Sequence, residues 1–295
     1  MRFRLVQVHE MIHAYSHKFC DEIHFSLKNY LLATRAAWPS GPPLTVPFVL
    51  WPGMDKPPGY QHFATRGKQE IGYAPVPAGV ALTEMVLSQY EELFVDFVCA
   101  AAAGAAYWTT MFDFETGCTS TDRLFCSRWT VHQPYLYDPH PIPAARLILL
   151  PQMFLQVFAE KDGLGGISET DRSRILKLIR DHVQRYLLSR LPSTNKQTTL
   201  TYENPDGPSG LQKISVPFES LVPFYYAVCR CYRSLGLMWM KENHPLSVFS
   251  WWFFSTDYHR RILDLVEEFA KTTPRRIPDY FFDSIAGATA ARIVV

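Results

Sequence analysis

Apolar residues in the first part of the chain recur every three or four positions, which is the spacing of one face of an α-helix. They are Leu5, Val8, Ile12, Tyr15 and Phe19. No proline or glycine precedes Pro39, so we predict a helix from residue 3 to about residue 33. The same spacing predicts a second strong helix from Val80 to about Tyr107.

Helical spacing also dominates the second half of the chain. We predict helices there over about residues 143–160, 168–190, 217–242 and 247–272. The intervening residues 192–215 read as a loop or a short hairpin. The expected fold class is therefore mainly α with little or irregular β structure, in two units: residues 1–141, and a helical subdomain of residues 142–295 packed on the first.

Two stretches interrupt this pattern. Prolines and glycines over residues 38–80 exclude long helices. Leu44 to Trp51 could form a short strand, which Pro47 would confine to a sheet edge because it has no N–H to donate. The aromatic residues of this excursion favour an ordered wall over a linker. Residues 109–141 are polar and are expected to be irregular as well.

Composition limits the classes of protein that fit. Hydrophobic residues make up 47% of the chain and charged residues 19%, which is typical of a globular protein. A net charge of +1 gives no electrostatic reason to expect nucleic acid or an anionic membrane as a partner. The first residues lack the apolar core of a signal peptide, and the apolar stretches are too short or too interrupted to read as membrane spans.

The cysteine pattern does not indicate a cysteine zinc site, because no C-x-x-C pair is present among the six cysteines. Cys118 and Cys126 are the pair best spaced for a disulfide. Scattered cysteines in a chain of this length are more often buried thiols, and we favour that interpretation.

One motif carries chemistry: His9-Glu10-Met11-Ile12-His13, which spells H-E-x-x-H inside the first predicted helix. Two imidazoles four residues apart lie on one helical face and can reach the same Zn²⁺. Glu10 would project beside them toward a metal-bound water. His17 continues the ladder, but the helix carries it about 6 Å further along the axis, so we expect it to face solvent or to support a ligand.

The second predicted helix carries acidic residues on an otherwise apolar background. Glu92 and Asp96 are four residues apart and share a face. Buried carboxylates need a partner, and a metal with its histidines is one. His9, His13 and Glu92 would leave one position of a tetrahedral zinc site open for water, as in catalytic sites. Asp96 could then accept the free ring N–H of a ligating histidine.

These residues resemble the signature of the gluzincin zinc metallopeptidases, thermolysin-like in the broad sense, in which H-E-x-x-H is followed on a second helix by E-x-x-x-D. The second motif is Glu92-Leu93-Phe94-Val95-Asp96, and the resemblance covers the two helices that carry the motifs, about a tenth of the chain. It implies zincin-like active-site helices, zinc ligands His9, His13 and Glu92, the catalytic base Glu10 and an outer carboxylate Asp96. The family places a β-sheet before the first motif, so we expect a fragment or a divergent version.

The implied activity is zinc-dependent hydrolysis of peptide bonds in a peptide or protein substrate. Another amide or acyl hydrolase would use the same activated water. The alternatives from other classes are a catalytically inactive zincin-like scaffold or interaction domain, and a chance pair of core histidines in a helical protein. No nucleic acid or membrane partner is expected.

Several further residues are weaker candidates. An oxyanion could be stabilised by one of six side chains, among which the sequence does not choose: His132, Tyr135, Tyr137, His140, Tyr202 and His259. His62 is a minor ligand candidate. Glu84 and Glu91 are expected at solvated helix positions, with Glu91 as the alternative ligand if the helix is rotated by one residue. The aromatic run Trp251 to Phe254 is expected to pack in the core.

Overall fold

A computed structural model describes most of the chain. The described residues are 4–35, 41–118, 124–128, 139–159, 168–182, 199–203, 213–247, 260–261, 263–265 and 267–268. Within them the fold is mainly helical with little β structure, as predicted. None of these helices is both long enough and apolar enough to span a bilayer.

The first predicted helix forms as two helices joined by a single 3-10 turn. Helix α1 covers Arg4–Ser16, the turn covers His17–Phe19 and α2 covers Cys20–Ala33. The buried face of α2 consists of Ile23, Leu27 and Leu31 at four-residue spacing, and Ile12 of α1 is buried as well. The apolar period that predicted these helices is therefore the period of their buried face.

The second predicted helix is also divided. Helix α3 covers Ala78–Ser88, α4 covers Tyr90–Ala103 and α5 covers Ala105–Cys118. Gly104 separates the last two with a φ of +53°, a conformation that is easy only for glycine. The prediction that residues 109–141 are irregular is wrong for the first ten of them, because α5 continues to Cys118.

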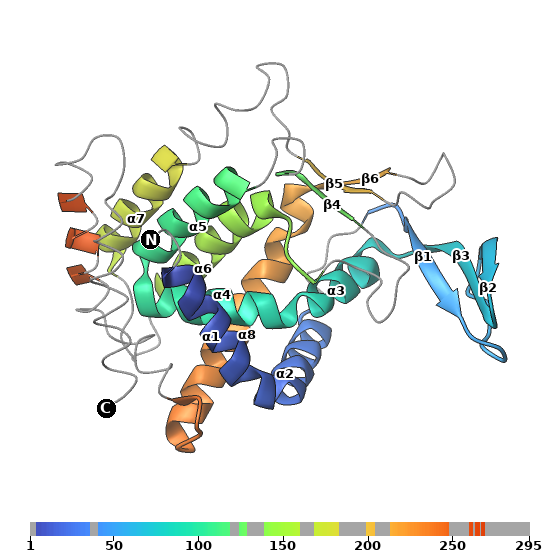
Figure 1. Ribbon diagram of the computed structural model, residues 1–295, viewed down its shortest axis with the longest axis horizontal. Helices are drawn as coiled ribbons and strands as arrows, with labels where there is room; N and C mark the ends of the chain where they lie inside the picture. Colours follow the sequence, from blue (N-terminus) through green and yellow to red (C-terminus); the bar gives the residue numbers. More distant parts are fainter. Residues whose placement is uncertain are drawn as a thin grey trace.

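Helix α4 is the centre of the helical part. Every residue from Leu93 to Ala103 is buried, and α4 contacts α1, α2, α3, α5 and α8 (Figure 1). Small and apolar residues run along α4, so other helices can approach it from several sides. A helix that is apolar all round is stable only when other elements enclose it. Its polar exceptions, Glu92 and Asp96, therefore lie inside the protein.

The Pro-rich excursion is not irregular, in contrast to the prediction. It forms an antiparallel sheet of order β1-β3-β2, with β1 at Leu44–Leu50, β2 at Gln61–Arg66 and β3 at Gln69–Val76. The expected strand and its edge position are confirmed. A two-residue loop at Gly67, with φ +60°, joins β2 to β3. Figure 1 shows this sheet projecting to one side of the helices.

The second half contains the predicted helices where it is described. A π-helical turn at Ala145–Leu149 leads into α6 at Leu150–Ala159, followed by α7 at Glu169–His182 and α8 at Val222–Lys241. Strands β5, Thr199–Glu203, and β6, Lys213–Pro217, form the hairpin that was one of two alternatives, and β4, Cys126–Arg128, pairs parallel to β5. Most of residues 247–272, including Trp251 to Phe254, lie outside the described residues.

Helices from the two predicted units, residues 1–141 and 142–295, contact one another. Helix α8 packs on α6 but also on α2 and α4. Trp239 of α8 donates a hydrogen bond from its ring N–H to the Glu22 carboxylate of α2 at 2.6 Å. The division at residue 141 stays a prediction, and these contacts cross it.

Candidate metal centre

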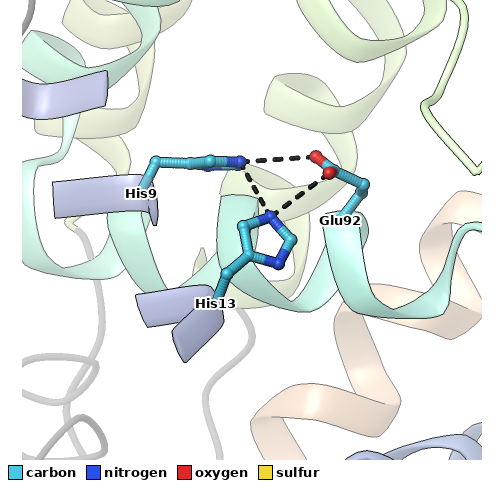
Figure 2. A group of neighbouring side chains, drawn as sticks. All are labelled: His9, His13 and Glu92. Carbon is cyan, nitrogen blue, oxygen red and sulfur yellow. Dashed lines mark hydrogen bonds and ion pairs between the residues drawn. The ribbon is translucent and has the colours of Figure 1, made fainter. Parts of the chain in front are cut away.

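Helices α1 and α4 bring together the three side chains that the sequence assigned as ligands. Figure 2 shows His9 and His13 extending from α1 toward Glu92 of α4. The Nε2 atoms of the two imidazoles are 3.1 Å apart. Glu92 Oε2 lies 3.3 Å from His9 Nε2, and Glu92 Oε1 lies 3.2 Å from His13 Nε2. One potential ligand atom of each side chain therefore lies within 4.8 Å of the other two.

These separations have the size that a tetrahedral zinc site requires. Zinc bonds to nitrogen and oxygen are about 2.0–2.1 Å long, so ligand atoms at tetrahedral angles lie about 3.3 Å from one another. The two imidazole nitrogens are 3.1 Å apart, and each has one Glu92 oxygen near it, Oε1 at 3.2 Å from His13 Nε2 and Oε2 at 3.3 Å from His9 Nε2. The donor set and its spacing therefore fit Zn²⁺ with a fourth position for water.

The outer nitrogen of His9 is held by Tyr107 and Asp96. The Tyr107 hydroxyl donates its hydrogen to Asp96 Oδ1, so its oxygen can only accept from His9 Nδ1, 3.3 Å away. Asp96 Oδ1 itself lies 3.5 Å from His9 Nδ1. This network places a hydrogen on His9 Nδ1, so that in the singly protonated ring the Nε2 lone pair faces Glu92.

That arrangement needs a positive species at the centre. The Nε2 lone pair of His9 and the Glu92 carboxylate are both electron-pair donors, 3.3 Å apart. Two such groups repel unless a proton or a cation lies between them. A hydrogen on His9 Nε2, a hydrogen on His13 Nε2 or a metal ion would each remove this repulsion, so the geometry of His9 is compatible with a bound cation.

His13 provides that positive charge when no metal is bound. Burial lowers the pKa of His13, but hydrogen bonds to Glu92 and Glu91 and the charges of both carboxylates outweigh it and raise the pKa to about 9. Glu91 Oε1 accepts from His13 Nδ1 at 3.2 Å. A proton on Nε2 then points at Glu92 and occupies the place that a metal would take.

Glu92 is held ionised by its neighbours. Burial raises the pKa of Glu92, but hydrogen bonds from His13 and His9 and the charge of Arg146 bring it well below its usual range. The Arg146 guanidinium Nη2 lies 3.4 Å from Glu92 Oε2. The carboxylate is therefore available as an anionic ligand across the whole physiological pH range.

Arg146 is the buried cation beneath the site. Its Nε and Nη2 donate to the two Asp96 oxygens at 2.7 and 2.5 Å, and its Nη1 donates to Glu115 at 3.3 Å. Burial lowers the pKa of Arg146, but the charge of Asp96 raises it well above its usual value. One guanidinium cannot neutralise both Asp96 and Glu92, so negative charge remains for a divalent cation to offset.

The structure places the remaining predicted residues as follows. Glu10 follows His9 on α1 and is exposed, and within the described part of the chain it makes no hydrogen bond to the three ligands. Its assignment as base, and the roles of His9, His13, Glu92 and Asp96, stay predictions. His62 lies on β2, near Thr65 and Glu70, and is not part of the centre. Glu84 is exposed, as expected.

Of the oxyanion candidates, His140 is brought to the centre. Its Nε2 lies 3.4 Å from Glu92 Oε1, and its side chain is 62% exposed. Tyr202 lies on β5. His132, Tyr135, Tyr137 and His259 lie outside the described residues.

Three neighbours of the centre were missed or misplaced by sequence reasoning. Glu91 was expected at a solvated position, but it is only 32% exposed and holds His13. Tyr107 appeared only as the end of a predicted helix. Arg146 was not singled out, although a lone arginine in the apolar run Ala144 to Leu150 is a signal of a buried charge that needs partners.

The disulfide between Cys118 and Cys126 is wrong, and the interpretation as buried thiols is confirmed for Cys99, Cys229 and Cys231, whereas Cys20 and Cys126 are partly exposed thiols. Cys126 forms no disulfide with Cys118. The described cysteines are all reduced thiols: Cys20, Cys99, Cys126, Cys229 and Cys231.

Comparisons with protein-family models, with curated proteins and with solved structures find no match.

Proposed function

We propose that this chain is a zinc-dependent metallopeptidase of the gluzincin type. The observation that carries the proposal is the convergence of His9 Nε2, His13 Nε2 and the Glu92 carboxylate at 3.1–3.3 Å, with the opposite ring nitrogen of each histidine held by an acid or a hydroxyl. Zinc ligands in proteins have this double arrangement of inner donors and outer hydrogen-bond acceptors.

When bound, Zn²⁺ supplies a water of lowered pKa and polarises a substrate carbonyl. The residues around it do the rest. Glu10, accessible beside His9, takes the proton of the attacking water and passes it to the leaving amine. His140, exposed at the rim, is positioned to donate a hydrogen bond to the oxyanion as it forms. Tyr107 and Glu91 keep the ring hydrogens on the outer nitrogens, so that the Nε2 lone pairs face the metal.

The metal is tested apart from the activity. Zinc that binds only the folded state raises the free energy of unfolding, by about 2.7 kcal/mol when free zinc is one hundred times the dissociation constant. We expect urea unfolding of the wild type and of His62→Ala to show this gain. In His13→Ala the gain should shrink by the part that the His9, His13 and Glu92 centre contributes. A gain in His13→Ala as large as that of the wild type would show that zinc does not bind at this centre.

The activity is tested with a mixed peptide pool, with and without a chelator. We expect the wild type to hydrolyse peptides only when zinc is present. Loss of a general base typically costs a factor of about 100 to 10,000, so Glu10→Gln should be at least about 100-fold slower while it still binds zinc. Glu84→Gln, a substitution of an exposed glutamate on α3, is the matched control.

Two results would contradict this assignment. Undiminished hydrolysis by Glu10→Gln would exclude Glu10 as the base. A zinc-loaded wild type that cleaves no peptide would favour the catalytically inactive scaffold. In that case the centre stabilises the fold or recognises a partner and does not hydrolyse peptides.

A further inference from the structure

A second group of metal-ligating side chains lies beside the first. His17 belongs to the 3-10 turn after α1, Cys20 is the first residue of α2, and Glu91 precedes Glu92 on α4. Each offers one ligand atom, and these atoms lie within 4.8 Å of one another. None of the three is a ligand in the proposed catalytic centre.

The local backbone explains why His17 and Cys20 meet. Side chains three residues apart are eclipsed in a 3-10 helix, whereas in an α-helix they are offset. The turn at His17–Phe19 interrupts the α-helical path at this point and places Cys20 Sγ 3.7 Å from His17 Nδ1. The continuous helix that the sequence predicted would not have aligned these two side chains in this way.

Their separation is the one that a bound zinc ion would require. With bonds of about 2.3 Å to sulfur and about 2.0–2.1 Å to nitrogen, tetrahedral ligands are about 3.6 Å apart. The observed 3.7 Å is within the tolerance of such sites.

The group is also accessible to an ion from solvent. His17 is exposed, while Cys20 and Glu91 are partly exposed. Cys99, Cys229 and Cys231 are buried in contrast. Among the described cysteines, Cys20 therefore combines solvent access with a histidine and a carboxylate within ligand distance.

We propose that His17, Cys20 and Glu91 form a second site for Zn²⁺ or a similar borderline-soft divalent cation. Thiolate, imidazole and carboxylate are all ligands that zinc accepts. The Cys20 thiol gives up its proton to solvent on binding, and water completes the coordination.

Glu91 connects this site to the first one, a step that rests on the proposed function. Its Oε1 accepts the ring hydrogen of His13 at 3.2 Å. A cation on the same carboxylate draws its charge away and weakens that hydrogen bond. Outer hydrogen-bond partners typically change metal affinity by about 10- to 100-fold, so occupancy of the second site weakens the first, and by reciprocity the first weakens the second.

Cobalt distinguishes the two sites, because the first contains no sulfur. Co²⁺ bound to a thiolate gives an intense near-ultraviolet charge-transfer absorption that nitrogen and oxygen ligands do not give. We expect titration of the metal-free protein with Co²⁺ to produce this absorption. Cys20→Ser and His17→Ala should lose it, while Cys126→Ser, which removes another partly exposed thiol, should keep it.

A double variant separates this proposal from the proposed function. In His9→Ala/His13→Ala the first site is removed, and the thiolate absorption should remain, with tighter Co²⁺ binding than in the wild type. If the wild type lacks the absorption, or if it survives in Cys20→Ser, the second site does not exist. If the absorption is present but Cys20→Ser binds no metal at all, the second site stands and the catalytic zinc site does not.

Discussion

Two clusters of charged residues in this protein differ in what they leave unsatisfied. At the start of α7, Arg174 donates to both oxygens of Glu267 at 3.0 and 2.8 Å and to Asp264 at 2.8 Å. Asp171 accepts from Ser168, Arg174 and Arg260. In this cluster each donor faces an acceptor, and each charge faces its opposite.

The centre between α1 and α4 is satisfied at its outer edge only. Arg146, Tyr107 and Glu91 match donors with acceptors in the same way. At the middle, Nε2 of His9 and Nε2 of His13 both face the Glu92 carboxylate, at 3.3 and 3.2 Å, and the two nitrogens lie 3.1 Å apart. The α7 cluster matches donors with acceptors, whereas here three potential metal ligands face one another around a place that a proton or a cation can occupy.

The largest expected effect tests the difference in burial between the two clusters. Arg146→Met would leave the buried Asp96 carboxylate, which is fully enclosed, without its guanidinium. Removing one partner of a buried ion pair costs about 3–5 kcal/mol. We expect urea unfolding at neutral pH to show a loss of that size. A loss below about 1 kcal/mol would show that Asp96 is solvated or protonated and does not depend on Arg146.

The site could be predicted from sequence where its members follow helical spacing. His9 and His13, and likewise Glu92 and Asp96, are four residues apart within single helices, so each pair shares a face. Tyr107 and Arg146 were not predictable in this way, because they reach Asp96 from other helices. Their roles depend on tertiary packing, which local spacing does not encode.

The fold shows the same limit. Apolar period predicted which segments are helical but not where they break, because the ends depend on single residues such as Gly104 with its positive φ. The β2–β3 hairpin was missed because its strands are only six and eight residues long and do not alternate between buried and exposed positions. The two-residue loop at Gly67 was its only local signal.

A rise in pH should change the contributions of the two clusters to the free energy of unfolding in opposite directions. In the metal-free protein the pKa of His13 is raised to about 9 from an unfolded value near 6.5. Its stabilising contribution is therefore complete below about pH 6.5 and is lost as the pH rises through about 9. After allowance for solvent screening we expect a loss of about 1–2 kcal/mol, measured by urea unfolding in chelator, and none in His13→Gln.

The contribution of Asp171 to stability depends on pH with the opposite sign. Burial raises the pKa of Asp171, but hydrogen bonds from Ser168 and Arg260 outweigh it and lower the pKa below its ordinary value. This contribution is present above the unfolded pKa and is lost as the pH falls through the folded one. Stability that fell at low pH equally in Asp171→Asn and in the wild type would contradict the assignment.

A smaller effect tests the outer edge of the metal centre. Tyr107→Phe removes the hydroxyl between His9 and Asp96, which then face each other directly at 3.5 Å. Because Asp96 remains, we expect zinc affinity to fall by about tenfold, the lower end for such partners. Competition with a chromogenic chelator measures it. Tyr232→Phe removes a buried hydroxyl that donates to the Tyr90 carbonyl at 2.7 Å, and should leave zinc affinity unchanged.

The smallest effect is expected in the α7 cluster. Arg174 is 30% exposed, and its partner Asp264 is 56% exposed. Ion pairs in such positions contribute about 0.2–1 kcal/mol, so Arg174→Met should lower the free energy of unfolding by no more than about 1 kcal/mol and should not alter zinc binding. A loss as large as that of Arg146→Met would show that the cost of breaking an ion pair in this protein does not depend on its burial. The two clusters would then differ only in how their donors and acceptors are arranged.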